Sequence, residues 1–236
     1  MSLEIRSQAL KSFSPDGGDI LRIEWLGHAC FLIENKDRIR IMIDPYDPSL
    51  GYVPISDEVD IVLVSHDHFD HNYVEGVKGS PFVITTPELR NVKGVTISGI
   101  ELFHDKAGGR ERGKTIAFMI DSDGLRLVHL GDVGHVPTPV QLSKFGRVDV
   151  LFIPVGGFYT VDGVDARKIV SELNPKIVIP MHFKTPALNF PIDGVESFLA
   201  GLKNVEFLNK NWIELDPYLL PKETKVVVMQ YRKKEV

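Results

Sequence analysis

Four side chains that could bind a metal ion lie within six residues of one another, between His66 and His71. His66 and His68 are two positions apart, so an extended backbone points both imidazoles in the same direction. Asp70 and His71 follow where the chain must turn, which directs them toward a second position. Imidazole nitrogen and carboxylate oxygen are ligands of Zn²⁺ and its first-row neighbours. The spacing therefore predicts a metal centre.

Three further donors lie later in the chain, each at the carboxyl end of an apolar run. They are His104 after Val95–Phe103, Asp132 after Leu125–Leu130, and His182 after Lys176–Pro180. The ends of strands are where a rigid scaffold gives way to functional loops. One tetrahedral ion cannot accept so many donors, so the full set favours two ions.

Two other histidines are alternatives to His104. His129 lies inside an alternating apolar run and is expected to pack in the core, whereas His135 follows a glycine and could approach from a loop. We prefer His104, which ends the predicted strand Val95–Phe103 and precedes the glycine-rich loop Lys106–Gly113.

Short apolar runs rich in β-branched residues predict the strands that must position these donors. Leu21–Leu26, Cys30–Glu34 and Ile39–Asp44 are separated by turn residues and are expected to pair in antiparallel fashion, and Asp60–Ser65 is expected to be a buried strand. Further strands are predicted near 81–85, 94–103, 114–121, 125–130, 149–154 and 176–181, and Lys225–Tyr231 is expected at a sheet edge.

Helices are predicted mainly in the second half of the chain. Asp165–Leu173 has apolar residues at helical spacing, and the pattern stops before Asn174-Pro175. Asp193–Glu196 resembles a capping box that would begin a helix to about Leu202. A third helix is expected over Pro139–Phe145. Two sheets in one α/β domain, with helices outside, accommodate this order. We expect a loose lead-in over 1–19 and a single domain over 20–236.

Composition narrows the class of protein. The 236 residues carry 27 Lys and Arg and 32 Asp and Glu, a net charge of −5, which gives no basic excess for a nucleic-acid backbone. The single cysteine, Cys30, cannot form an internal disulfide. No apolar run is long enough to cross a membrane, and the N-terminus lacks the apolar stretch of a signal peptide. We therefore expect a cytoplasmic protein with a small-molecule substrate and neither nucleic-acid nor membrane partners.

The segment HDHFDH at 66–71 is an instance of the HxHxDH motif, and the chain resembles the metallo-β-lactamase superfamily. Trp25–Cys30 and Ile43–Pro45 resemble a branch of uncharacterised metal-dependent hydrolases, which is similar to sugar-lactone lactonases and to phospholipase D-type members. The resemblance covers about residues 20–210. It implies a four-layer αβ/βα sandwich of two mixed sheets, with outer helices and the metal site at one edge.

The resemblance also implies how the donors divide. His66, His68 and His104 would hold one ion, Asp70, His71 and His182 a second, and Asp132 would bridge them. Two such ions, zinc by default with manganese or iron possible, lower the pKa of a shared water so that the bridging hydroxide attacks. Asp70 would also act catalytically by orienting this nucleophile. The implied function is hydrolysis of a small ester, lactone or phosphodiester.

Other residues are candidates for supporting roles. His28 could orient a metal ligand or contact the substrate, or it could be a hydrogen-bonded buried histidine. Asp44 could accept the N–H of a ligand histidine, or it could form a turn before Pro45. Cys30 is expected in the core. Arg110, Arg112 and Lys184 could bind an anionic group or be solvated surface charges. Gly156–Tyr159 could form an aromatic wall or a turn.

Two other functions are compatible with the same donors. One is an RNA-processing nuclease of the same superfamily, against which the net charge and the absence of an extended basic insertion both count. The other is a non-catalytic metal-binding module that retains the ligands.

Overall fold

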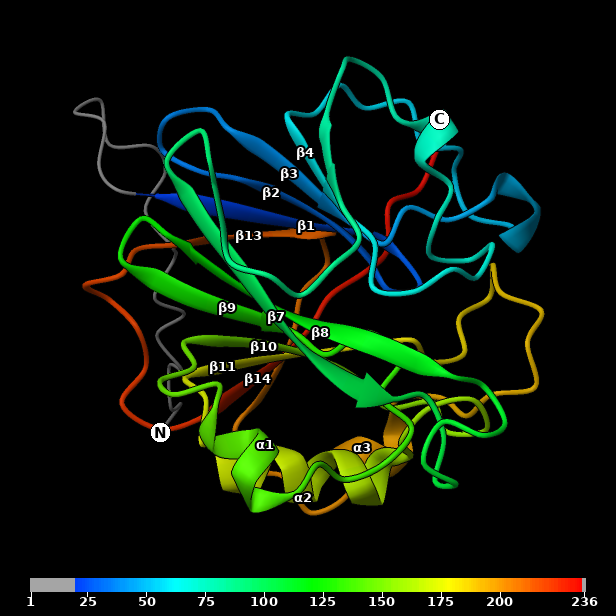
Figure 1. Cartoon of the computed structure of the whole chain (residues 1–236). Coiled ribbons are helices and arrows are strands. Elements are labelled where there is room, and N and C mark those ends of the chain that lie inside the picture. The colour runs from blue at the N-terminus through cyan, green and yellow to red at the C-terminus, as the bar shows by residue number, and fades with distance from the viewer. Residues whose placement is uncertain (1–19, 235–236) are drawn as a thin grey trace, which may run out of the picture.

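The computed structural model describes residues 20–234, which form two β-sheets packed face to face (Figure 1). The predicted lead-in over 1–19 lies outside the described residues. One hydrophobic cluster extends across both sheets, and Phe31 and Phe152 meet within it at a ring-centroid distance of 4.4 Å. Burying each such side chain contributes roughly 1.5–3 kcal/mol, so the core between the sheets fixes their separation and orientation.

The first sheet has six strands. Its order is β13 (Trp212–Leu215), β1 (Leu21–Gly27), β2 (Cys30–Glu34), β3 (Arg40–Ile43), β4 (Ile61–Leu63) and β5 (Phe82–Ile84). The pairs from β13 to β3 are antiparallel, as predicted for the first three runs, and β3–β4 and β4–β5 are parallel.

The second sheet has eight strands. Its order is β12 (Val205–Phe207), β14 (Lys225–Val228), β11 (Ile177–Met181), β10 (Val150–Pro154), β9 (Leu125–His129), β8 (Lys114–Ser122), β7 (Val95–Phe103) and β6 (Arg90–Val92). The strands from β12 to β9 are parallel, and the pairs from β9 to β6 are antiparallel. Both sheets are therefore mixed, which confirms the predicted sandwich.

The α-helices lie along the outer side of the eight-stranded sheet (Figure 1): α1 (Pro139–Ser143), α2 (Gly163–Leu173) and α3 (Glu196–Leu199). Helix α2 begins where Asp162 Oδ1 accepts hydrogen bonds from the backbone of Val164 and Asp165 (2.9 Å each), and it ends at Asn174 in a left-handed conformation. Among the described residues, no helix has the length and hydropathy to cross a bilayer.

Loops and two 3₁₀ turns, η1 (Pro48–Leu50) and η2 (Val74–Gly76), cover the outer face of the six-stranded sheet. A second hydrophobic cluster lies here and joins outward side chains of β1–β4, such as Leu26 and Met42, to loop residues such as Tyr52 and Leu188. The outer layer on this side thus consists of irregular chain rather than α-helix.

Some predicted elements differ from the observed ones. Lys225–Tyr231 was expected at a sheet edge, but β14 lies between β11 and β12. The capping box at Asp193 is wrong, because α3 is shorter and begins after Val195 without a side-chain cap. Strands β6, β12 and β13 are three or four residues long and largely half-buried or exposed, so their apolar patterns are weak.

Candidate metal centre

The seven predicted donors converge at one end of the sandwich, where β3, β4, β7, β9 and β11 end. They come from the loop after β4, from the residue after β7, and from the residues that follow β9 and β11. Every one of the seven lies within 4.8 Å of at least two others, measured between potential ligand atoms. The sandwich therefore gathers residues that are more than 100 positions apart in the chain.

Three polar residues in or beside the donor cluster have a left-handed backbone. They are His28 in the β1–β2 turn (φ 53°), Asp44 after β3 (φ 49°) and His182 after β11 (φ 50°). This conformation is uncommon for residues with a Cβ atom and tends to occur where function requires a particular side-chain direction. Here each reversal turns a polar side chain into the cluster.

One group of donors contains His66, His68 and His104. His66 Nδ1 lies 2.9 Å from Ser65 Oγ, which itself donates to Asp44 Oδ2 at 2.7 Å. Because that hydroxyl has already donated its proton, it accepts from His66 Nδ1–H, and the His66 Nε2 lone pair faces His68 Nδ1 at 3.0 Å. Three imidazoles therefore surround one point, a typical donor set for a first-row metal ion.

A second group contains Asp70, His71 and His182, together with His28. His28 Nε2 lies 3.1 Å from Asp70 Oδ2, and its ring lies 4.0 Å from that of His182 between centroids. The backbone N–H of His182 donates to the carbonyl of His28 (3.1 Å), so the β1–β2 turn is attached directly to the end of β11. Of the two interpretations given for His28, the structure favours contact with the donor cluster.

Asp132 lies between the two groups. Its Oδ2 atom is 3.4 Å from His104 Nε2 and 3.9 Å from His66 Nε2 on one side. On the other side it is 3.2 Å from both His71 Nε2 and His182 Nε2. A carboxylate among four imidazoles can bridge two cations.

Asp44 lies on the buried side of the donor cluster and supports it through hydrogen bonds. Its carboxylate is fully buried and accepts hydrogen bonds from Ser65 N (2.7 Å), Ser65 Oγ (2.7 Å) and His71 Nδ1 (2.9 Å). The last bond places the proton of His71 on Nδ1 and leaves Nε2 facing Asp132. Such a carboxylate–histidine pair fixes the tautomer of a metal ligand. The structure thus supports the ligand-orienting interpretation of Asp44.

The ionisation of the cluster favours cation binding. Burial, with the neighbouring His182, lowers the pKa of His28 to about 4, and burial with His71 lowers that of His66 to about 3, so both are neutral at pH 7. Burial opposes ionisation of Asp132, but His182 and His71 outweigh it and hold its pKa well below the usual range. Burial likewise disfavours a charged His71, yet Asp132, Asp70 and Asp44 raise its pKa well above the ordinary value. The carboxylates therefore favour positive charge at this point.

Several buried polar atoms of the cluster have no hydrogen-bond partner among the described residues. They include His71 Nε2, His104 Nδ1, Asp132 Oδ1 and both ring nitrogens of His182. A buried polar atom without a partner costs about 1–3 kcal/mol. His71 Nε2 and His182 Nε2 each lie 3.2 Å from Asp132 Oδ2 without the alignment of a hydrogen bond, so a cation placed among them could satisfy both nitrogens and the carboxylate. The donor set therefore fits divalent metal ions.

Two glycines let the loops approach this closely. Gly131 has φ 53°, and a Cβ atom there would lie 2.3 Å from Thr115 Oγ1. At Gly134 a Cβ atom would lie 2.4 Å from the backbone of His104 and Asp105. The loop that carries Asp132 can thus pack directly against the loop that carries His104.

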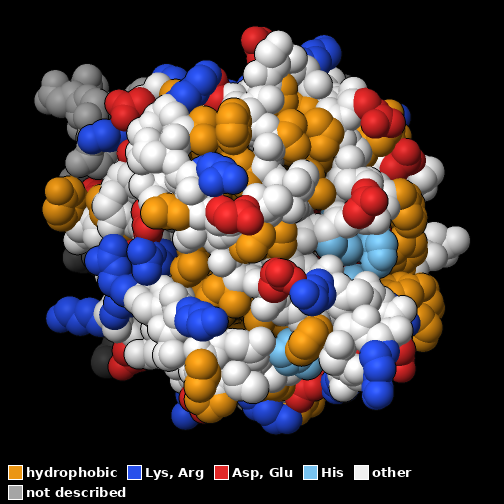
Figure 2. Space-filling model, in the orientation of Figure 1, with side chains coloured by type: hydrophobic (Ala, Val, Ile, Leu, Met, Phe, Trp, Pro, Cys, Tyr) orange, Lys and Arg blue, Asp and Glu red, His pale blue; other side chains and the backbone are white. Residues whose placement is uncertain are grey.

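A pocket of about 450 Å³ opens above the cluster. Five predicted donors, His68, Asp70, His104, Asp132 and His182, form its floor, and Phe69, Arg112, Tyr159 and Phe190 form most of its wall. Figure 2 shows histidine side chains at the surface along one edge of the molecule, beside hydrophobic side chains. A pocket of this volume suits a small molecule.

The other candidate residues lie outside the donor groups. His129 is buried, and its Nε2 donates to the Ala29 carbonyl (2.9 Å), while His135 Nε2 accepts from the backbone of Phe103 (3.2 Å). Cys30 lies in the outer hydrophobic cluster, where burial raises the pKa of its thiol. These placements agree with the preference for His104 and with a structural Cys30.

Two supporting residues escaped the sequence analysis. Ser65 orients His66, and Phe190 lines the pocket from a loop far along the chain. Ser65 is adjacent to the motif and ends a strand, which was a usable signal. Nothing in the sequence around Phe190 indicates that it returns to the site.

Comparison with known proteins bears on the same region. A family model described as a beta-lactamase superfamily domain matches residues 22–182. A metal-dependent hydrolase of Caldivirga maquilingensis is 32% identical over 191 residues, which cover 69% of this chain and 82% of the relative. A metal-dependent hydrolase of Archaeoglobus fulgidus is 29% identical over 70% of this chain and 84% of the relative.

Solved structures are similar as well. A Thermotoga maritima protein assigned to the Zn-dependent hydrolases of the metallo-beta-lactamase superfamily is 40% identical, with a TM-score of 0.76 over 90% of this chain and 100% of that chain. A structure from Parabacteroides distasonis has a TM-score of 0.66 at 17% identity, covering 94% of this chain and 98% of its own, which supports the fold alone.

Proposed function

Because this chain belongs to the metallo-β-lactamase superfamily and is a metal-dependent hydrolase of that superfamily, we propose that it cleaves a small ester, lactone or phosphodiester with two divalent metal ions. Zinc fits the donor set best, and the carboxylates also permit manganese or iron. His66, His68 and His104 would hold one ion, Asp70, His71 and His182 the other, and Asp132 would bridge them. The observation that carries the proposal is the position of Asp132 between two groups of histidines, whose buried nitrogens include several without a hydrogen-bond partner in residues 20–234.

Metal ions bound here would supply an activated water and polarise the oxygen of the bond to be cleaved. The protein's own contribution is orientation. Asp70 is ionised, because His71 and the hydrogen bond from His28 outweigh burial and hold its pKa well below the usual range. Its carboxylate can therefore accept a hydrogen bond from the attacking water and direct that water into the pocket.

Surrounding residues keep Asp70 and the ligands in place. His28 Nε2–H donates to Asp70 Oδ2, and this bond does not engage the other carboxylate oxygen, Oδ1. Asp44 holds His71, and Ser65 holds His66. Preorganised groups of this kind lose little free energy to rearrangement during reaction. No serine or cysteine nucleophile is required.

The proposed partner is a small molecule rather than RNA. Besides the net charge of −5, the C-terminal Arg232 is not available to a polyanion, because it pairs with Glu24 (2.8 Å) and Asp57 (2.5 Å).

The test is a pair of variants assayed at matched metal content on a panel of lactone, ester and phosphodiester substrates. Asp70→Asn retains the size of the side chain and removes its charge, so we expect a rate loss of at least about 10²-fold, a scale typical of positioned proton-transfer groups. Cys30→Ser should leave the rate nearly unchanged. Full activity of Asp70→Asn together with inactive but folded Cys30→Ser would show that the mechanism is wrong.

A further inference from the structure

The pocket above the histidine cluster has one cationic side chain among the described residues that line it, Arg112. Two other cations on nearby loops do not line it. Arg110 is exposed, and Lys184 Nζ donates to the carbonyl of Phe190 at 2.7 Å. The positive charge of the wall is therefore concentrated on one side chain.

The loop that carries Arg112 is held in place by the carboxylate of Asp105, which is nearly fully buried. This carboxylate accepts four backbone N–H groups, those of Ala107 (2.7 Å), Gly109 (2.8 Å), Glu111 (3.0 Å) and Arg112 (2.9 Å). The loop also closes where the N–H of His104 donates to the carbonyl of Gly113 (3.0 Å). The backbone of Arg112 thus has a fixed position relative to the donor group, which lowers the entropic cost of binding a ligand.

The guanidinium of Arg112 is oriented but has unused hydrogen-bond donors. Its Cζ atom lies 5.3 Å from the centroid of the Tyr159 ring, so a cation–π contact supports one face. Within the described chain, its nearest carboxylate is that of exposed Glu111 at 3.7 Å, and its side chain makes no hydrogen bond. The planar edge with its N–H groups remains able to bind an oxyanion in a bidentate manner.

Aromatic rings form the adjoining wall. Tyr159 and Phe69 both contact Phe190 edge to face, at ring-centroid distances of 5.7 and 6.4 Å. Phe69 is 53% exposed although it belongs to the wall of a pocket. Exposed apolar surface that converges on one pocket is typical of a ligand site.

Among the described residues, none of the carboxylates that line the pocket forms an ion pair with Arg112. Asp70 and Asp132 face the histidines of the floor, and Asp67 accepts a hydrogen bond from the side chain of Asn72. Asp67 keeps its negative charge, because its hydrogen-bond donor is a neutral amide, so Arg112 is the group on the wall that attracts an anion and Asp67 the group that opposes it.

Building on the proposed hydrolase function, we propose that the substrate is a small molecule with an oxyanion, a carboxylate or phosphoryl group, bound by Arg112. Its apolar body, a ring or a short chain, packs against Phe69, Tyr159 and Phe190. The bond to be cleaved then lies over the histidine cluster. Arg112 is thus the residue that determines specificity.

A binding measurement tests this without turnover. Phenylphosphonate titrated into the metal-loaded protein by calorimetry should bind Arg112→Gln at least about tenfold more weakly than the wild type, as loss of one charge-assisted pair predicts. Arg112→Lys should be intermediate, because it keeps the charge and loses the planar fork. Arg110→Gln, the matched control, should bind like the wild type. Equal affinity of Arg112→Gln and the wild type would overturn the inference.

The aromatic wall has its own test. Phe69→Ala should weaken phenylphosphonate about threefold or more and leave methylphosphonate unchanged, because only the former has a ring to stack. Phe207→Ala, a substitution of an exposed phenylalanine on the distant strand β12, is the control. Equal weakening of both phosphonates by Phe69→Ala would contradict ring packing.

Measurements of hydrolysis distinguish the proposed anion site at Arg112 from the proposed hydrolase function. The ratio of kcat/KM for mono-4-nitrophenyl succinate to that for 4-nitrophenyl acetate should fall at least about tenfold in Arg112→Gln. If both esters are hydrolysed and Arg112→Gln does not change the ratio of kcat/KM values, the role of Arg112 is wrong and the proposed hydrolase function stands. Binding of phenylphosphonate that depends on Arg112, without hydrolysis of any ester, lactone or phosphodiester, would support the anion pocket and overturn the hydrolase.

Discussion

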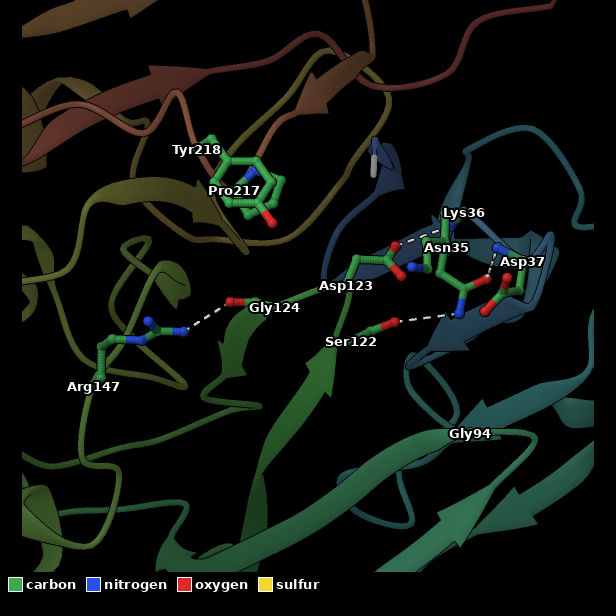
Figure 3. Close-up of a pocket in the computed structure, with 10 residues that line it drawn as sticks. All are labelled: Asn35, Lys36, Asp37, Gly94, Ser122, Asp123, Gly124, Arg147, Pro217 and Tyr218. Carbon is green, nitrogen blue, oxygen red and sulfur yellow. Dashed lines mark hydrogen bonds between the residues drawn. The ribbon is translucent and has the colours of Figure 1, made fainter. Parts of the chain in front are cut away.

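The two ends of the β-sandwich each contain a hollow of similar size, about 450 Å³ at the histidine cluster and about 510 Å³ at the opposite end of the strands. The second, which we term the hairpin-end hollow, is shown in Figure 3. It is lined by Asn35, Lys36, Asp37, Gly94, Ser122, Asp123, Gly124, Arg147, Pro217 and Tyr218. Volume alone does not distinguish the two.

Among the described residues, the hairpin-end hollow contains no buried side-chain polar atom without a hydrogen-bond partner. The side chain of Asn35 donates to Ser122 Oγ (3.2 Å) and accepts from the backbone of Asp37 (3.0 Å) and Ile39 (2.8 Å). Arg147 donates to the carbonyl of Gly124 at 2.8 Å (Figure 3). The bond from Asn35 to Ser122 joins the β2–β3 turn to the end of β8, so this end stabilises the packing of one sheet on the other.

The metal end does the opposite. It buries ring nitrogens of His71, His104 and His182 and an oxygen of Asp132 without hydrogen-bond partners in the described chain. Within residues 20–234, buried polar groups are hydrogen-bonded at one end of the sandwich and lack partners at the other. The end where partners are lacking is therefore the one suited to binding a ligand. Buried polar atoms without hydrogen-bond partners thus identify the functional end of the sandwich better than the volume of the hollow does.

Substitution of Asp132 should have the largest effect. Asp132→Asn removes the charge shared by four imidazoles, so we expect loss of bound metal and a fall in the rate of about 10³-fold, within the range for positioned catalytic groups. Elemental analysis and kinetics on one sample check this. Asp37→Asn in the hairpin-end hollow is the control and should change the rate less than twofold. If both variants retain metal and activity, the contrast between the two ends has no functional meaning.

The substitution Asp44→Asn should have the second-largest effect. The variant weakens the hydrogen bonds that orient His71 and Ser65, and loss of such support typically lowers metal affinity by 10- to 100-fold. Competition with a chelator of known affinity measures the change. Because Asp44 is fully buried, unfolding of the metal-free protein must be measured in parallel. Unchanged metal affinity in a folded variant would argue against the orienting role.

His28→Asn should have an intermediate effect. Asparagine tolerates the left-handed backbone at this position, so the substitution removes mainly the imidazole contact with Asp70. We expect a rate about tenfold lower and a smaller loss of metal, because the proposed ligand Asp70 is kept but its orientation is less restricted. His135→Asn, outside both donor groups, should retain the wild-type rate. A wild-type rate in His28→Asn would assign His28 to packing alone.

The smallest effect on activity is expected at the hairpin end. Asn35→Ala leaves the N–H groups of Asp37 and Ile39 without their partner, so the free energy of unfolding should fall by about 1–2 kcal/mol. Denaturant unfolding in the presence of a chelator measures this without the contribution of metal binding. Metal content and rate should stay at wild-type values. A large loss of activity without loss of stability would show that the two ends are coupled.

Much of the scaffold was predictable because its information is local. Apolar runs such as Asp60–Ser65 predicted strands near their observed positions, and Asn174-Pro175 indicated the end of α2. Short strands with mixed burial were missed. Strand β13 pairs with β1 only because the chain after β12 crosses to the other sheet, and no local pattern encodes that crossing.

The sequence by itself determined which side chains can bind metal, because the types and spacing of His66–His71 and the donors at the ends of later strands are local properties. The tertiary structure alone decided how they are supported. His28 reaches Asp70 across 42 positions, Arg112 stacks on Tyr159, and Asp44 lies beneath both Ser65 and His71. These contacts depend on how two sheets and their loops pack, and packing is set by long-range burial that no short segment contains.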